Sequence, residues 1–215
     1  RPEGRRLKGE SITRGRGEIL SLLGMHGTCL THALQIKQSK KMRVSESGHA
    51  GEGAYFWAYE TNKRYAIELA ECWWAFWKHK GKYQDCSDDR CAVLDAKIRK
   101  PDDQVFLDAT GMWFREALDT ALRASKKTES DLPAVTEFLI QELQEEAKTQ
   151  FHIVKIDIKT PSVIKGREQV VAQIVSRLAS AYVVKKSGLD LIQDIDLVNG
   201  ENNERIDGES SSENK

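Results

Sequence analysis

Apolar and polar positions follow several distinct patterns along the first half of the chain. Residues 18–23 carry a run of isoleucine and leucine typical of a buried strand, and residues 31–38 fit a short helix. Residues 39–53 are rich in Ser, Gly and Lys and predict a loop that leads into a short strand at Ala54. A helix is expected from Thr61, a good N-cap residue, with apolar positions at Ala66, Leu69, Ala70, Trp73 and Trp77. We interpret its tryptophan stripe as core, with an aromatic ligand platform as the alternative.

The second half of the chain mixes strand and helix patterns without a regular βαβ order. Strands are expected over residues 92–98, 105–108, 151–158 and 181–184. Helical spacing of apolar residues marks residues 114–122, 135–143 and 167–179. A final alternation of apolar and polar positions covers residues 189–197. This order predicts an α+β fold rather than a doubly wound sheet.

The composition is that of an ordinary globular chain and indicates one domain. Of the 215 residues, 33 are Lys or Arg and 33 are Asp or Glu, so the net charge neither requires nor excludes a nucleic-acid partner. We expect a basic arm over residues 1–17, a single domain over residues 18–198 and a disordered polar tail over residues 199–215. The arm could contact phosphates, although a solvated terminus is the simpler interpretation.

Neither a membrane segment nor a signal peptide is expected. No window approaches the roughly 18 apolar residues that a membrane span needs, and no apolar segment leads to a small-residue cleavage site. The four cysteines are expected to be reduced thiols in a cytoplasmic protein. Cys86 and Cys91 have His79 nearby, but a structural zinc site usually shows two close ligand pairs and the sequence shows one. We therefore expect no metal.

Two short motifs carry the chemistry expected of the chain. His26, Gly27 and Thr28 close the first apolar strand. Residues 51–56, "GEGAYF", lead two glycines into an extended segment that contains Tyr55, and glycines so spaced allow a tight turn. Each motif alone fits an ordinary helix cap or hairpin, but the two together, in this order, are more specific.

Together these motifs resemble the ADP-ribosyltransferase superfamily, in its diphtheria-toxin and poly(ADP-ribose) polymerase branch, which carries a His-Tyr-Glu set on three strands. "HGT" matches the first motif, and "GEGAYF" with the alanine-containing helix after it matches the second. The third motif opens with the catalytic glutamate, and in "SAYVVKKSGLDLIQDIDL" Ala181 occupies that position. The resemblance spans roughly residues 19–198. It implies a split, mixed or antiparallel β-sheet core flanked by helices.

The resemblance also implies that NAD is the second substrate, held bent while its bond to nicotinamide breaks. The NAD-binding set that the motifs imply is His26, Gly27, Thr28, Gly53, Tyr55 and Phe56. Within it His26 would bond a ribose hydroxyl. The backbone of Gly27, supported by Thr28, would hold the nicotinamide amide, and Tyr55 would stack on the nicotinamide ring. The family's glutamate would stabilise the positive charge that develops at the ribose C1′, which an alanine cannot do.

The alanine at position 181 leaves three interpretations open. A toxic enzyme has been silenced by a deliberate Glu-to-Ala change, or the chain is a natural module that binds NAD or ADP-ribose without catalysis. Alternatively, another group has taken over the acid's role; Glu168 and His152 are nearby in sequence, but neither opens a matching strand. The intact residues around Ala181 favour an inactivated variant.

The function implied is transfer of ADP-ribose from NAD to a macromolecule by a bacterial toxin or phage-defence effector, a class that implies an antitoxin partner. RNA or DNA is favoured over protein as the acceptor, because Lys40, Lys41 and Arg43 form a cationic loop between the motifs, although a solvated loop fits equally well. The runner-up is an RNA 2′-phosphotransferase, which shares the His-Gly-Thr strand but has a second histidine where Tyr55 stands. Here His49 lies in the preceding loop.

Overall fold

The computed structural model describes residues 20–161 and 177–198. The expected basic arm over residues 1–17, the polar tail over residues 199–215 and most of the helix expected over residues 167–179 lie outside the described residues. Within the described part of the chain, no helix combines the length and the apolar character needed to cross a membrane.

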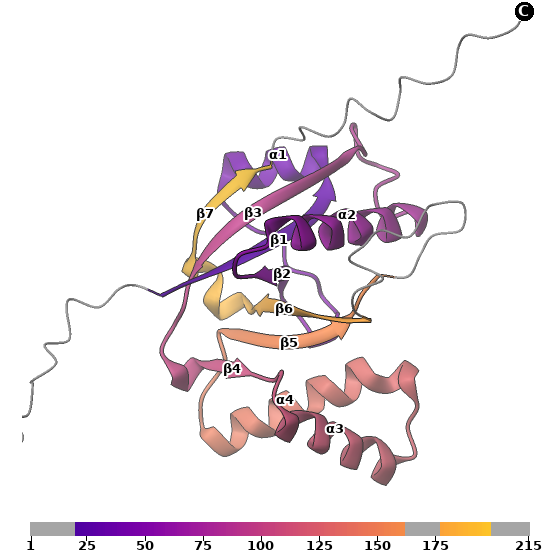
Figure 1. Cartoon of the computed structure of the whole chain (residues 1–215), viewed down its shortest axis with the longest axis vertical. Helices are drawn as coiled ribbons and strands as arrows, with labels where there is room; N and C mark the ends of the chain where they lie inside the picture. The colour runs from indigo at the N-terminus through magenta and orange to yellow at the C-terminus, as the bar shows by residue number, and fades with distance from the viewer. Residues whose placement is uncertain (1–19, 162–176, 199–215) are drawn as a thin grey trace, which may run out of the picture.

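Seven strands of the described chain form one mixed sheet, with helices packed against it (Figure 1). The strands are β1 (Ser21–Cys29), β2 (Ala54–Tyr59), β3 (Cys91–Arg99), β4 (Phe106–Asp108), β5 (Ile153–Lys159), β6 (Leu178–Val184) and β7 (Ile192–Leu197). The α-helices are α1 (Leu30–Ser39), α2 (Lys63–His79), α3 (Met112–Ser125) and α4 (Leu132–Ala147). The strand order is β4-β5-β6-β2-β1-β3-β7, in which β4 and β5 pair in parallel and the other neighbours pair antiparallel. The predicted α+β class, a mixed sheet flanked by helices, is confirmed.

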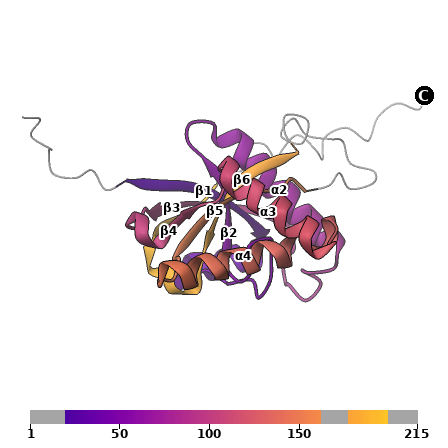
Figure 2. The same cartoon turned by 90° about the horizontal axis from the view of Figure 1, so that it is seen from below.

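The two faces of the sheet bury different helices. Successive side chains of a strand point to opposite faces, so neighbouring residues of β2 enter separate cores. Trp57 packs in the core beneath α2, α3 and α4, together with Leu69 and Phe114. Phe56 packs in the core beneath α1, together with Ile36. α3 and α4 pack against each other at the lower end of the molecule in Figure 1, and Figure 2, seen from below, shows both in front of the sheet.

β1 and β2 separate in the middle of the sheet. They pair over three residues, ending with Met25 opposite Trp57. Beyond that point β1 continues along β3 as far as Cys29, and β2 continues along β6 back to Ala54. The sheet is therefore split between residues 26–29 and residues 54–56, and both sequence motifs lie at this split.

The structure corrects three local predictions. Asn62 rather than Thr61 caps α2, because its side chain accepts a hydrogen bond from the backbone N–H of Tyr65 at 3.3 Å. Residues 178–179, expected at the end of a helix, begin β6 and pair with β5. Residues 186–191 form a 3₁₀ helix, so the alternating segment expected over residues 189–197 is a strand from Ile192 onward. Short apolar runs do not distinguish helix from strand by periodicity alone.

Candidate functional site

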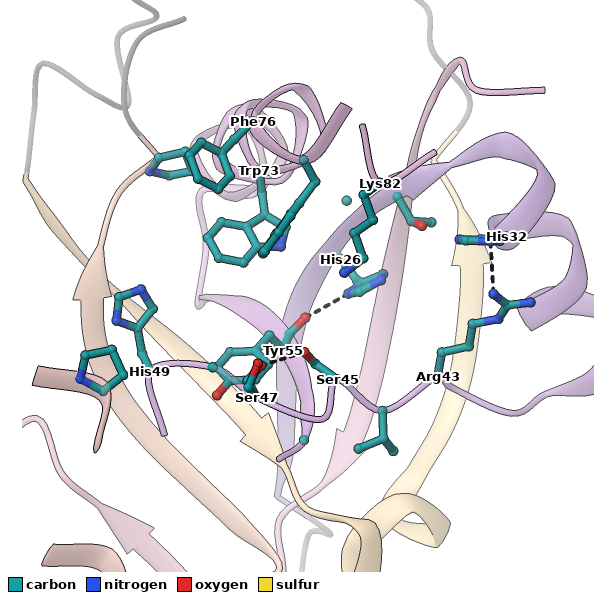
Figure 3. Close-up of a pocket in the computed structure, with 18 of the residues that line it drawn as sticks. His26, His32, Arg43, Ser45, Ser47, His49, Tyr55, Trp73, Phe76 and Lys82 are labelled. Carbon is teal, nitrogen blue, oxygen red and sulfur yellow. Dashed lines mark hydrogen bonds between the residues drawn. The ribbon is translucent and has the colours of Figure 1, made fainter. Parts of the chain in front are cut away.

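A cavity of about 700 Å³ opens where β1 and β2 separate. This volume lies within the roughly 300–1,000 Å³ that small-molecule pockets usually have. His26, Gly27 and Thr28 of β1 line it, and so do Gly53 and Tyr55 of the second motif. Figure 3 shows His26 and Tyr55 next to each other in this cavity, although 29 positions separate them in the chain. The split in the sheet therefore brings the two motifs to one site.

His26 is a partly buried, neutral side chain of defined tautomer. Its Nδ1 lies 2.9 Å from the carbonyl oxygen of Tyr55. A carbonyl oxygen accepts and never donates, so Nδ1 carries the proton and Nε2 keeps a free lone pair. Burial, the largest cause, lowers the pKa of His26 below its usual 6.5 against the opposing effect of the Tyr55 bond. At neutral pH the ring can thus accept a hydrogen bond from a ligand hydroxyl.

Gly27 and Thr28 pack the end of β1 against α2 and against Tyr83. A Cβ on Gly27 would lie 1.8 Å from the carbonyl oxygen of Ala70 in α2, so only glycine allows the helix to come this close. Thr28 is buried, and it hydrogen-bonds Tyr83, whose pKa is raised to about 12 mainly by burial. Tyr83 also lines the cavity. The wall of the cavity on this side therefore consists of close-packed backbone and the buried side chains of Thr28 and Tyr83.

Tyr55 fixes the loop that precedes β2. Its hydroxyl donates to the carbonyl oxygen of Gly51 at 2.7 Å and accepts from the backbone N–H of Ala50 at 3.0 Å. Gly51 has a φ of 72°, the left-handed conformation that glycine adopts without strain. Burial is the largest of the causes that raise the pKa of Tyr55 to about 12, so the phenol remains protonated. Lys185 of the segment after β6 donates to the carbonyl oxygen of Ala50 and holds the same loop.

An aromatic wall faces the cavity from α2, formed by Trp73, Phe76 and Trp77. The rings of Trp73 and Phe76 stack at 6.1 Å with an interplanar angle of 25°, and Figure 3 shows both on the α2 side of the cavity. Trp74, one position on, is instead buried with Tyr83. Trp73 and Trp77 are partly buried and pack against core clusters, as the interpretation of the stripe as core expects, and both also line the cavity, which is the alternative of an aromatic platform.

Trp77 and Lys82 give the aromatic wall a polar end. The Trp77 Nε1–H is buried and has no hydrogen-bond partner among the described residues. Buried donors are normally paired, so this unpartnered N–H carries a cost of desolvation. The Lys82 ammonium lies 4.5 Å from the centroid of the Trp77 ring and lines the cavity. Burial lowers the pKa of Lys82 from 10.5.

Ala181 does not line the main cavity; it lies beside it and brings no polar group there. It pairs with Trp57 of β2 and is 1% exposed. Together with Gly27, Tyr55 and Trp73 it lines a small second cavity of about 10 Å³. Such a volume is close to that of a single water-sized probe. Position 181 therefore lies where the two motifs meet, but the alanine leaves it uncharged.

Among the described residues that line the main cavity, the acidic side chain is Glu137 of α4. A Cβ on Gly51 would lie 2.3 Å from Glu137 Oε1, which places this carboxylate at the Tyr55 loop. Its charge contributes to raising the pKa of Tyr55. Of the two substitutes considered from sequence, His152 does not line the cavity and Glu168 lies outside the described residues. Nothing in the pattern of α4 distinguishes Glu137 from its other glutamates, so sequence reasoning missed it.

The other predicted residues divide between the cavity and the rest of the molecule. Arg43 lines the cavity, and its guanidinium donates to Gln35 Oε1 at 2.6 Å and lies 2.9 Å from His32 Nε2. Lys40 and Lys41 are exposed after α1 and do not line the cavity. Phe56 is fully buried on the opposite face of the sheet, where it packs against the His26 ring, and does not line the main cavity.

The loop before β2 adds a third histidine to the cavity, after His26 and His32. His49 lines it, and burial lowers the pKa of this side chain. From sequence His49 was placed outside the second motif strand, which is correct, but the loop folds back so that it still reaches the site.

The chain was compared with protein-family models, with curated proteins and with solved structures, and none of the three comparisons found a match. The function of the site is therefore argued from its own geometry and chemistry.

Proposed function

We propose that this cavity binds NAD and that the site belongs to an NAD-dependent ADP-ribosyltransferase, represented here by an inactive form with Ala181 in place of the catalytic acid. The observation that carries the proposal is that His26 and Tyr55, from separate motifs, line one cavity at the split of the sheet. The neutral imidazole is an acceptor suited to a ribose hydroxyl, and the close-packed glycine backbone is suited to an amide. The aromatic rings are suited to a flat cationic ring.

Each part of NAD has a matching group in the cavity. His26 Nε2 would accept a hydrogen bond from a ribose hydroxyl, because Nδ1 is already committed to Tyr55. The backbone at Gly27 would hold the nicotinamide amide, and Tyr55 and Trp73 would stack on the nicotinamide ring. Lys82 would neutralise the diphosphate.

The proposed reaction breaks the bond between the nicotinamide nitrogen and the ribose C1′. Nicotinamide leaves with the bonding electron pair, and an acceptor oxygen or nitrogen attacks C1′ and loses its proton to a base or water. The barrier depends on stabilising positive charge at C1′, for which a fixed carboxylate is the most effective group. With alanine at position 181, we expect the chain to bind NAD and to turn it over poorly.

Replacing Tyr55 by alanine is expected to weaken NAD binding about 10- to 100-fold, because ring stacking contributes roughly 1–3 kcal/mol. Isothermal titration of the chain with NAD measures this. Tyr55→Phe is the matched control, since it keeps the ring and removes the hydroxyl bonds to residues 50 and 51. We expect it to bind within about threefold of the unchanged chain. Equal losses in both variants would show that the loop, and not the ring, supports binding.

NAD affinity is expected to be constant above pH 6.5 and to weaken below it. The pKa of His26 is lowered from 6.5, so Nε2 gains a proton, and stops being an acceptor, only in acid. Acid is expected to destabilise the fold as well, because His26 has a higher pKa in the unfolded chain and binds the proton there more readily. His32 and His49 line the cavity with lowered pKa values as well, and His26→Gln separates their effects. An acid limb that persists in His26→Gln would contradict the assignment.

We propose nucleic acid, RNA in particular, as the acceptor, because Arg43 lies at the cavity beside an aromatic wall on which bases can stack. In an Ala181→Glu background, Arg43→Ala is expected to lower labelling of RNA from radiolabelled NAD about tenfold, the effect of one charge-assisted contact. The Lys40→Ala, Lys41→Ala double variant is the control and should label RNA normally, since neither lysine lines the cavity. Label confined to the protein fraction would refute an RNA acceptor.

The wider biological proposal is a cytoplasmic toxin or phage-defence effector that an antitoxin restrains. Its support is the resemblance of the two motifs together with the alanine at the position of the acid. Growth arrest on expression of Ala181→Glu, with normal growth on expression of the unchanged chain, would agree with it. NAD binding by Ala181→Glu without nicotinamide release would favour a module that binds NAD or ADP-ribose and does not catalyse.

One observation supports an RNA 2′-phosphotransferase as a second candidate: His49 and Arg43 line the same cavity as His26. An RNA that carries a 2′-phosphate, supplied with NAD, distinguishes the two reactions. Loss of that phosphate with consumption of NAD would favour the phosphotransferase, and ADP-ribose retained on the RNA would favour the transferase.

A further inference from the structure

Three metal-ligating side chains meet beside the cavity, outside the proposed NAD contacts. They are Cys29, His32 and Cys86, whose ligand atoms all lie within 4.8 Å of one another. The Sγ atoms of Cys29 and Cys86 are 3.2 Å apart, and Cys86 Sγ is 3.5 Å from His32 Nε2. The cysteines are free thiols in the structure. This cluster differs from the pairing considered from sequence, because neither Cys91 nor His79 belongs to it.

The backbone holds the cluster in place by bonds that involve none of its side chains. Cys29 ends β1 and His32 lies in the first turn of α1. Cys86 comes from the loop between α2 and β3, which is tied to the start of α1. The backbone N–H of Leu30 donates to the Arg90 carbonyl at 2.9 Å, and Thr31 Oγ1 donates to the Asp88 carbonyl at 3.0 Å. The ligands are thus preorganised by the fold, which lowers the cost of binding an ion.

The donor set and spacing fit zinc better than other metals. Thiolate and imidazole ligands together favour zinc, while calcium and magnesium prefer oxygen. With zinc–sulfur bonds of about 2.3 Å and zinc–nitrogen bonds of about 2.0 Å, tetrahedral ligand atoms are about 3.5–3.8 Å apart. The distance between Cys86 and His32 already matches, and the two sulfur atoms need to separate by roughly half an ångström. A disulfide would instead require them to close to about 2.05 Å and would need an oxidant.

The nitrogen of His32 that faces the cluster has a lone pair available. Arg43 Nη1 lies 2.9 Å from His32 Nε2, and a guanidinium can only donate, so this nitrogen is unprotonated. Metal binding would replace that contact, while Arg43 keeps its bond to Gln35 Oε1. Two thiolates and one neutral imidazole would neutralise the charge of a divalent ion. Three protein ligands leave the fourth position of a tetrahedral site for water.

We propose that Cys29, His32 and Cys86 bind one zinc ion, with water as the fourth ligand. The ion would join the end of β1, the start of α1 and the loop that follows α2. That loop carries Lys82 and Tyr83 into the cavity, so zinc would fix this wall of the site. The proposal does not depend on NAD chemistry, and its test requires no turnover.

The test measures zinc in the full chain. Protein prepared with reductant and equilibrated with zinc is expected to hold about one ion per chain after gel filtration, by elemental mass spectrometry. Cys86→Ser and His32→Ala should each bind zinc at least about 100-fold more weakly in a chelator competition, since even outer partners of zinc ligands contribute 10–100-fold. Cys72→Ser, which alters a cysteine of α2 outside the cluster, is the matched control and should bind like the unchanged chain.

A second measurement keeps the proposal testable if a ligand variant does not fold. Cobalt(II) added to the unchanged chain should give a thiolate charge-transfer band and tetrahedral visible absorption, and zinc should remove both. Absence of bound zinc, unchanged affinity in a folded Cys86→Ser, or a Cys29–Cys86 disulfide that persists in reductant would each overturn the proposal.

Discussion

Replacing Ala181 by glutamate is expected to raise the rate of nicotinamide release from NAD about 10²- to 10³-fold, the effect of one well-placed group on developing charge. Position 181 pairs with Trp57 and lines a small cavity with Tyr55, Gly27 and Trp73. Ala181 does not line the main cavity, but Gly27, Tyr55 and Trp73 line both spaces, so we expect a glutamate at this position to direct its carboxylate toward the main cavity and the ribose of bound NAD. Release of nicotinamide from radiolabelled NAD, followed over time, gives the rate.

Ala181→Gln is the matched control for this gain. Glutamine has the shape of glutamate without its charge, so a faster reaction in both variants would indicate repacking rather than electrostatic stabilisation. No gain in Ala181→Glu, with NAD affinity unchanged, would remove position 181 from the mechanism. Glu137, the carboxylate that lines the described part of the cavity, would then be the acid to test, and Glu137→Gln should abolish any basal release.

Changing Gly27 to alanine is expected to lower the free energy of unfolding by about 3 kcal/mol or more, at the upper end of overpacking effects. The added Cβ would lie 1.8 Å from the Ala70 carbonyl oxygen, an atom of the α2 backbone. A flexible side chain could turn away, but a helix backbone must shift as a unit. Because α2 also carries Trp73 and Phe76 into the cavity, NAD binding should fall together with stability. Urea unfolding, followed by circular dichroism, measures the change.

Gly111→Ala provides the control for Gly27→Ala. Its Cβ would lie 2.9 Å from the Trp113 side chain, which is 48% exposed and can move. We expect a loss of less than about 1 kcal/mol, the usual scale for a helix N-cap change. If Gly27→Ala were as stable as Gly111→Ala, the close approach of β1 and α2 would not be a structural requirement.

The amino-acid sequence by itself determined most of the secondary structure and the motif residues of the site. Leu94, Ala96 and Ile98 alternate in a way that predicts β3, and the structure buries all three. Apolar spacing likewise predicts α2, α3 and α4. These predictions succeed because the burial of one face imposes a local period on the chain. The two motifs predicted that His26 and Tyr55 belong to one site, and in the structure both line one cavity.

Only the tertiary structure decided which distant side chains complete the site. Glu137 and Lys82 reach the cavity from segments without a distinctive motif. Trp73 lines the cavity, whereas its neighbour Trp74 is buried in a separate core cluster. Cys29 and Cys86 meet across 57 positions of sequence. The physical reason is that periodicity records whether a residue is buried, but not against what. Which residues pack against each other depends on strand register and on the path of loops, which are set by contacts between residues far apart in the chain.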